Sequence, residues 1–314
     1  MTAYLAHSLQ YRRLLMRLPS GSVAYRDRLL DAMASLLVDL HRAGVYWGDC
    51  SLANTLFRRD GDKIQAFLVD AETSEVHPSL SDGQRAYDLE VLVENVAFGL
   101  ADLAALQGRD DDFEDAISAA EGVRTRYRAL WDELHAEHDL RAGDRHAIEA
   151  RVRRLNDLGF SIDEIELEPG DRTGRLRLRV AVTTRRFHAR ELEERTGIVA
   201  LEGQARLLMN DLREYRTWLA WSEGRPVDRL EGARRWRDEV YDPAMVRLVA
   251  VIGPERDPIQ TYCDVLEHKW LLSERAGRDV GFATALSAYL ASGAPAPESA
   301  GAVAALEPID DVEP

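Results

Sequence analysis

One stretch of the chain constrains its fold more than any other, because it places polar, chemically active residues in a fixed order between regular elements. Residues 45–57 (VYWGDCSLANTLF) follow an amphipathic helical pattern and lead into a β-rich run. They carry Asp49 and, five positions later, Asn54. An Asp-Gly pair at Asp60 then predicts a tight hairpin turn, and the second apolar strand of that hairpin is followed by Asp70.

This order matches the parts that phosphoryl transfer needs. One carboxylate must orient the attacking hydroxyl and accept its proton, while further oxygen ligands must hold magnesium. Asp49 and Asn54 lie on one loop and can face a shared cleft, which Asp70 can approach from the neighbouring hairpin. Asp and Asn are also common turn formers, so a spacing of this kind alone would mean little. The ordered set of helix, loop, hairpin and second Asp favours a phosphotransferase site.

The same residues resemble a known family. Trp47-Gly48-Asp49 with Asn54 resembles the catalytic loop of protein-kinase-like phosphotransferases, in the H-G-D form of aminoglycoside and lipopolysaccharide-core kinases. Asp70 stands where those proteins carry the metal-binding Asp of D-F-G, and Asp88-Leu89 resembles the pair that opens the next helix. The chain from about Tyr4 to Tyr289 closely resembles a bacterial family in which a lipopolysaccharide-kinase-like domain precedes a C-terminal domain of unknown function.

The resemblance implies a role for each matching residue. Asp49 would be the catalytic residue that orients the hydroxyl as general base, and Asn54 and Asp70 would be the magnesium ligands. The implied cofactors are ATP and Mg²⁺, and the implied reaction is transfer of phosphate from ATP to a hydroxyl of a small molecule or sugar. The identity of that acceptor does not follow from the sequence.

Three further residues would support the catalytic loop structurally, namely Trp47, Gly48 and Asp88. The sequence departs from the kinase pattern at two points. Trp47 replaces the usual His and cannot make the same bond, and the Phe and Gly of D-F-G are replaced by Ala71 and Glu72. Glu72 is a possible auxiliary ligand, although an exposed acidic residue is an equally good interpretation.

The parts that hold the nucleotide in kinases are missing from the sequence. Residues 3–5 resemble the hinge between the two lobes, there is no G-x-G-x-x-G motif, and the lysines are Lys63 and Lys269, outside any small lobe. We therefore expect Met1 to be internal to a longer protein that includes the small lobe. The alternative is a catalytically inactive kinase-fold protein that serves as a binding or scaffold module, with a protein partner over its exposed cleft face.

The hydrophobic pattern predicts an α+β, mostly helical chain: a protein-kinase-like large lobe at residues 1–160, a β-hairpin-plus-helices domain at 161–291, and a disordered tail at 292–314. The expected helices are 26–42, 84–106, 113–134, 144–159, about 192 onward, 201–219 and 260–275. The expected strands are 55–57, 64–69, 164–168 and 175–183.

Composition narrows the classes of partner. The net charge of −15 makes nucleic acid a poor partner. The chain has no apolar run of membrane-spanning length and no signal-peptide core, so we expect a cytoplasmic protein without a membrane span. Its two cysteines, Cys50 and Cys263, exclude a disulfide scaffold and a cysteine-rich zinc site.

Overall fold

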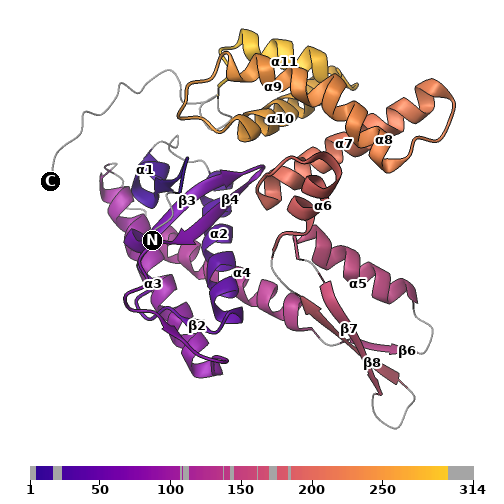
Figure 1. Ribbon diagram of the computed structural model, residues 1–314. Helices are drawn as coiled ribbons and strands as arrows, with labels where there is room; N and C mark the ends of the chain where they lie inside the picture. The colour runs from indigo at the N-terminus through magenta and orange to yellow at the C-terminus, as the bar shows by residue number, and fades with distance from the viewer. Residues whose placement is uncertain are drawn as a thin grey trace. The chain divides into compact units, whose positions relative to one another are not determined.

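The computed structural model describes residues 5–16, 23–106, 108, 113–136, 138–141, 145–160, 162–169, 175–182 and 185–295. The chain is α+β and mostly helical, as predicted (Figure 1). It forms two compact units. Unit 1 comprises Met1–Arg59, Lys63–Arg126 and Val246–Pro314, and unit 2 comprises Asp60–Asp62 and Tyr127–Met245. The domain boundary near residue 160 follows from the change in hydrophobic pattern, whereas these units are groups of residues in contact, so that boundary stays a prediction.

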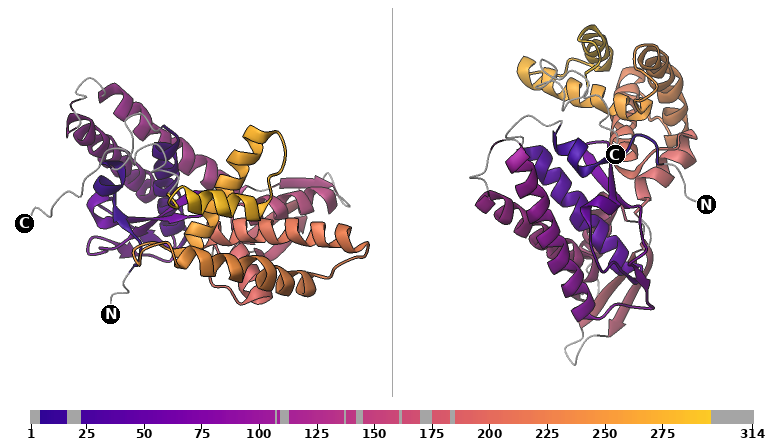
Figure 2. Two further views of the ribbon diagram at one scale, coloured as in Figure 1. Left: turned by 90° about the horizontal axis from the view of Figure 1, so that it is seen from above. Right: turned by 90° about the vertical axis from the view of Figure 1, so that its left-hand side faces the viewer.

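Unit 1 contains the predicted catalytic loop, two small sheets and the helices that cover them. Its N-terminal elements are β1 (Leu9–Gln10), α1 (Tyr11–Met16), α2 (Val23–Arg42), β2 (Val45–Tyr46), η1 (Leu52–Asn54), β3 (Thr55–Asp60), β4 (Lys63–Leu68), β5 (Glu75–Val76) and α3 (Asp82–Leu106). Its C-terminal helices are α10 (Pro258–Ala276) and α11 (Phe282–Ala291), which lie side by side (Figure 2). Helices α4 (Phe113–His135) and α9 (Asp242–Val249) run from one unit into the other.

The first sheet has the order β1-β3-β4, with Leu9 opposite Phe57 in an antiparallel pair. The second is the antiparallel pair β2-β5, with Val45 opposite Val76. Helix α2 packs against β4 because its apolar stripe, Leu30, Met33 and Leu37 among others, is buried. The predicted hairpin is confirmed, since β3 and β4 flank the Asp-Gly turn.

A glycine ends α2 and sets the entry to the catalytic loop. Gly44 has φ 76°, and a Cβ there would collide with the carbonyl of His77. The carbonyl of Gly44 accepts a hydrogen bond from His77 N at 2.8 Å. The segment after β5 is thereby held beside the start of the loop.

Unit 2 is built on a three-stranded sheet and a group of helices. Its strands are β6 (His138–Arg141), β7 (Ile162–Pro169) and β8 (Arg175–Val182), in the order β6-β8-β7. The predicted hairpin is β7–β8, and β6 is a third strand that the sequence did not indicate. Its helices are α5 (Arg145–Asp157), α6 (Phe187–Thr196), α7 (Glu202–Glu223) and α8 (Arg229–Trp236), followed by a π-helical turn, η3 (Arg237–Tyr241).

Buried polar contacts hold the helices of unit 2 together. The Glu202 carboxylate, at the start of α7, accepts hydrogen bonds from His188 N at 2.9 Å and Ala189 N at 3.0 Å, and so caps α6. Farther along α7, Asp211 accepts from Trp236 Nε1 at 2.8 Å. These contacts orient α6 and α8 against the apolar face of α7.

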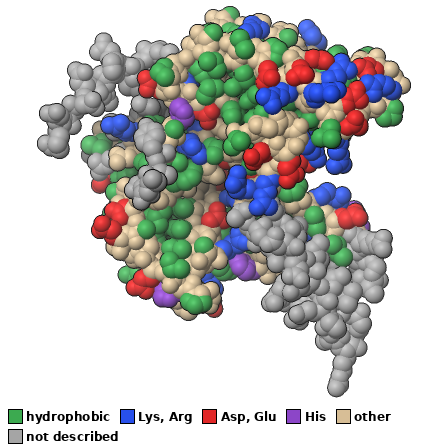
Figure 3. Space-filling view, in the orientation of Figure 1, with side chains coloured by type: hydrophobic (Ala, Val, Ile, Leu, Met, Phe, Trp, Pro, Cys, Tyr) green, Lys and Arg blue, Asp and Glu red, His purple; other side chains and the backbone are tan. Residues whose placement is uncertain are grey.

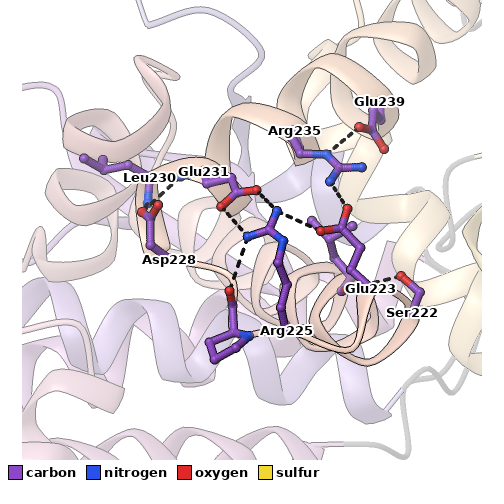
Figure 4. A network of polar contacts seen from close by, with 10 residues as sticks. Ser222, Glu223, Arg225, Asp228, Leu230, Glu231, Arg235 and Glu239 are labelled. Atoms are coloured by element: carbon purple, nitrogen blue, oxygen red, sulfur yellow. Dashed lines mark hydrogen bonds and ion pairs between the residues drawn. The ribbon is translucent and has the colours of Figure 1, made fainter.

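Charged side chains tie the outer ends of α7 and α8. Arg225 lies 2.7 Å from Glu223 and also pairs with Glu231, while Arg235 pairs with Glu223 and, at 2.8 Å, with Glu239 (Figure 4). The space-filling view shows acidic and basic side chains interspersed over this part of the molecule (Figure 3). Because these groups are partly exposed, each pair adds little stability alone.

The ends of the chain fall partly outside the described residues. Of the predicted hinge, only Leu5 is described, and the predicted tail is described only at 292–295. Two of these tail residues are packed, since Ala294 is buried and Tyr289 donates its hydroxyl hydrogen to Pro295 O at 2.7 Å, whereas Ser292 and Gly293 are exposed. No helix within the described ranges is both long enough and apolar enough to cross a lipid bilayer.

Candidate active site

The predicted catalytic loop lies between β2 and β3 and has an unusual backbone. Gly48 has φ 87° and Cys50 has φ 42°, so two of three consecutive residues are in the left-handed region. A non-glycine residue held there is uncommon and points to a loop whose shape is imposed by its surroundings. Ser51 then caps the short helix η1 by accepting a hydrogen bond from Ala53 N at 3.2 Å.

A fully buried carboxylate imposes much of that shape. Asp88, in the second turn of α3, accepts hydrogen bonds from Trp47 N at 2.7 Å and from Gly48 N at 2.8 Å. Asp88 has no exposed surface, so these charge-assisted bonds form away from water, where they are strong. The structure thus places Asp88 against the loop backbone, the position in which it could support the loop.

Two residues that the sequence interpretation missed complete this support. His41 Nε2, in the last turn of α2, lies 3.1 Å from Asp88 Oδ2. Asn95 Nδ2 donates to the carbonyl oxygens of Asp49, at 2.8 Å, and Cys50, at 3.2 Å. A signal for Asn95 was present, because it stands seven residues after Asp88 and therefore on the same face of α3.

Asp49 and Asn54 come together. Asn54 Nδ2 donates to Asp49 Oδ2 at 3.4 Å, a long hydrogen bond, while Ser51 N donates to Asp49 Oδ1 at 3.2 Å. Both side chains are half-buried. Since Asn54 uses its nitrogen toward Asp49, its amide oxygen is the atom that suits a cation. The loop therefore presents a carboxylate and an amide side by side.

The residue before Asp70 is hydrogen-bonded to the backbone of Asn54. Val69 N donates to Asn54 O at 3.0 Å, which holds the end of β4 beside Asn54. The Asp70 carboxylate accepts from Glu72 N at 3.1 Å in a local turn. The side chains of Asp70 and Glu72 are both exposed. The contact between these two residues is made by the backbone nitrogen of Glu72.

Trp47, which stands in place of the kinase His, connects the loop to the same segment by a different bond. Its carbonyl oxygen accepts from Thr73 Oγ1 at 3.2 Å. The indole is fully buried, and within the described part of the chain its Nε1 has no hydrogen-bond partner. The backbone of Trp47 thus provides a connection to the residues after Asp70.

Cys50 is not suited to nucleophilic chemistry. Its thiol donates to Asp88 O at 3.3 Å, and burial, followed by the nearby Asp88 charge, raises the pKa of the thiol well above its usual range. A protonated, buried thiol is inert at neutral pH.

Comparison with known protein families finds two matches along the chain. Residues 6–109 match the lipopolysaccharide kinase (Kdo/WaaP) family, and residues 129–293, more than half of the chain, match a domain of unknown function (DUF4032). All the site residues described above lie in the first segment. These matches confirm the resemblance inferred from the loop motif. Searches of curated proteins and of solved structures returned no significant match.

Proposed function

Because this chain belongs to the DUF4032 family and carries a lipopolysaccharide-kinase-family segment ahead of that domain, we propose that it is a phosphotransferase. It would transfer phosphate from ATP to a hydroxyl group of a small molecule or sugar. The observation that carries the proposal is the contact of Asp49 with Asn54, on a loop whose backbone is held by the buried Asp88.

In this reaction Asp49 acts on the acceptor. Its carboxylate orients the attacking hydroxyl and accepts its proton as the bond to phosphorus forms. The hydrogen bonds from Ser51 N and Asn54 restrict the rotation of that carboxylate. Asn95 and Asp88 fix the backbone on either side, so the proton acceptor is positioned before the substrate arrives.

The residues present fit magnesium by their donor chemistry. Asn54 offers an amide oxygen and Asp70 an exposed carboxylate, both hard oxygen donors, on segments joined by the bond from Val69 N to Asn54 O. Glu72 adds a second exposed carboxylate two residues from Asp70. When bound, magnesium would neutralise charge on the phosphate oxygens of ATP.

A second function is favoured by a specific observation. Trp47 stands where the kinase pattern has His, and Ala71-Glu72 stand where it has Phe-Gly, so two features of the catalytic pattern are absent from the described site. In that case the same surface would bind a protein partner without using nucleotide. The two functions differ in whether the chain binds ATP in the presence of magnesium.

The experiment uses the full-length protein and measures its ATP binding by calorimetry, with and without Mg²⁺, and its phosphate transfer to candidate sugars. Three variants are compared with the wild type: Asp70→Asn, Asp49→Asn and, as a control, Glu75→Gln, whose side chain is exposed and outside the site. We expect Asp70→Asn to weaken the magnesium-dependent binding about 10- to 100-fold. Asp49→Asn should retain binding and lose transfer by about 10²-fold or more.

Glu75→Gln should behave as the wild type in both measurements. Identical binding by wild type and Asp70→Asn, at equal Mg²⁺, would contradict the assignment of the metal ligands. Failure of the full-length wild-type protein to bind ATP under any of these conditions would contradict the phosphotransferase proposal. A stable complex recovered by pull-down would then support the binding module.

A further inference from the structure

A carboxylate in the C-terminal helices contacts the strand that follows the catalytic loop. Asp264, in α10, is 1% exposed, and its Oδ1 lies 2.8 Å from Arg59 Nη2. Arg59 Nη1 also donates a hydrogen bond to Asp264 Oδ2 at 3.2 Å, so one hydrogen bond and one ion-pair contact join the guanidinium to the two carboxylate oxygens. Both residues belong to unit 1, although 205 positions separate them in the sequence.

The same carboxylate is the centre of a larger polar cluster. Arg256 Nη2 donates to Asp264 Oδ2 at 3.3 Å and to the Tyr289 hydroxyl at 3.1 Å. Gln260 Nε2 donates to Asp264 Oδ1 at 3.3 Å. Asp264 thus joins β3 to α10 and to the segment before α10, and Arg256 extends the cluster to Tyr289 in α11.

The helix that carries Asp264 is embedded at this point. Six consecutive residues in its first half are buried: Gln260, Thr261, Tyr262, Cys263, Asp264 and Val265. A charge in such surroundings has little contact with water and depends on its ionic partners. Arg59 and Arg256 supply that compensation, and Arg59 comes from the lipopolysaccharide-kinase-family segment.

The position of Arg59 connects this cluster to the candidate active site. Arg59 is in β3, which begins immediately after Asn54, and β3 pairs in the sheet with β4, which ends just before Val69 and Asp70. A constraint on one end of a paired strand restricts the rest of the hairpin. A residue of the DUF4032 segment, Asp264, therefore directly contacts the β3–β4 hairpin, which connects the proposed magnesium ligands Asn54 and Asp70.

We propose that Asp264 and Arg59 are positioning residues, through which the C-terminal segment holds the β3–β4 hairpin and with it Asn54 and Asp70. The structural part of this proposal stands on the contacts alone. Its consequence for nucleotide binding rests on the proposed function, and the two parts are tested separately.

The first measurement is hydrogen exchange of the full chain, read at the backbone amides of residues 55–59 and 63–69, which belong to unit 1. We expect Asp264→Asn to accelerate exchange there about tenfold or more, because it leaves two arginines without their counter-charge. Arg59→Lys keeps the charge but loses the guanidinium with its two contacts to Asp264, and should give a smaller acceleration at the same amides. The control is Asp211→Asn, another buried aspartate, which contacts Trp236 in unit 2 and should leave these amides unchanged.

The pairing itself is tested by combining Arg59→Met with Asp264→Leu. If each acts by breaking the same contact, the double variant should show less acceleration than the product of the two single effects. Multiplicative effects would overturn the proposal, and so would unchanged exchange at residues 55–59 and 63–69 in both Asp264→Asn and Arg59→Lys. Should Asp264→Asn fail to fold, Arg59→Lys tests the same contact through the same amide exchange rates, at a less buried position.

The second measurement is magnesium-dependent ATP affinity of the same variants. Weaker binding by Asp264→Asn and Arg59→Lys, with unchanged binding by Asp211→Asn, supports the positioning role in the site. Accelerated exchange in these variants, together with a full-length wild-type protein that binds no ATP, would refute the proposed function and keep the structural coupling. Normal binding together with normal exchange would refute the coupling and keep the function.

Discussion

Replacing Asp88 by alanine is the perturbation that tests the catalytic loop most directly. The substitution removes the acceptor for two backbone donors, Trp47 N and Gly48 N, and the partner of His41, all at a carboxylate with no exposed surface. Each hydrogen bond to a buried charged group is worth about 1.5–3 kcal/mol, so the two backbone bonds alone account for about 3–6 kcal/mol. We expect a loss of about 4 kcal/mol in the local stability of the loop.

The assay is native-state hydrogen exchange at the amides of Trp47 and Gly48, supported by urea unfolding of the whole chain. A loss of about 4 kcal/mol corresponds to nearly a thousandfold increase in the exchange of a locally opening amide. The matched control is Asp82→Ala, at the start of the same helix, whose side chain is 97% exposed and pairs with Arg85. An exposed pair of that kind contributes at most about 1 kcal/mol. Similar small losses in both variants would refute the reasoning that Asp88 holds the loop.

Three other outcomes are expected. Asn95→Ala should destabilise the loop by about 1–3 kcal/mol in urea unfolding, because the carbonyls of Asp49 and Cys50 lose their donor. Gly48→Ala should cost at least about 1 kcal/mol, since φ is 87° and the added Cβ would lie 3.0 Å from a carbonyl oxygen; Gly253→Ala, with no described atom within 4 Å of its Cβ, should cost less, and an equal cost would contradict this account. The raised pKa of Cys50 predicts that iodoacetamide at pH 8.5 leaves its thiol unmodified in the folded chain and alkylates it after unfolding, as measured by peptide mass spectrometry.

Most of the regular structure was predictable because it depends on local patterns. The apolar stripe of α2 and the Asp-Gly turn between β3 and β4 are encoded within a few residues of one another. The short strand β6 was not predictable, because its four residues do not alternate between apolar and polar side chains. Its structure is defined by pairing with β8, where His138 lies opposite Leu178. Strands of that length acquire their structure from a distant partner.

Part of the candidate site was likewise predictable from the sequence, and part was not. The spacing of Asp49, Asn54 and Asp70 could be read from the chain, since a loop and the hairpin after it bring neighbouring positions together. The support from His41 could not, because it depends on how α2 and α3 pack around one carboxylate. Which residue packs against a given side chain depends on the whole fold, so such contacts do not occur at a fixed spacing in the sequence.

The amino-acid sequence alone determined the order of the chemical groups, the mostly helical class and the two-part family membership, because these depend on local periodicity and on motifs of adjacent residues. Only the tertiary structure decided that the left-handed loop is held by Asp88 and Asn95, and that Asp264 meets Arg59 across 205 positions. Burial is the physical reason. A buried charge is stable only when an oppositely charged or hydrogen-bonding group contacts it, and folding can supply that group from any position along the chain.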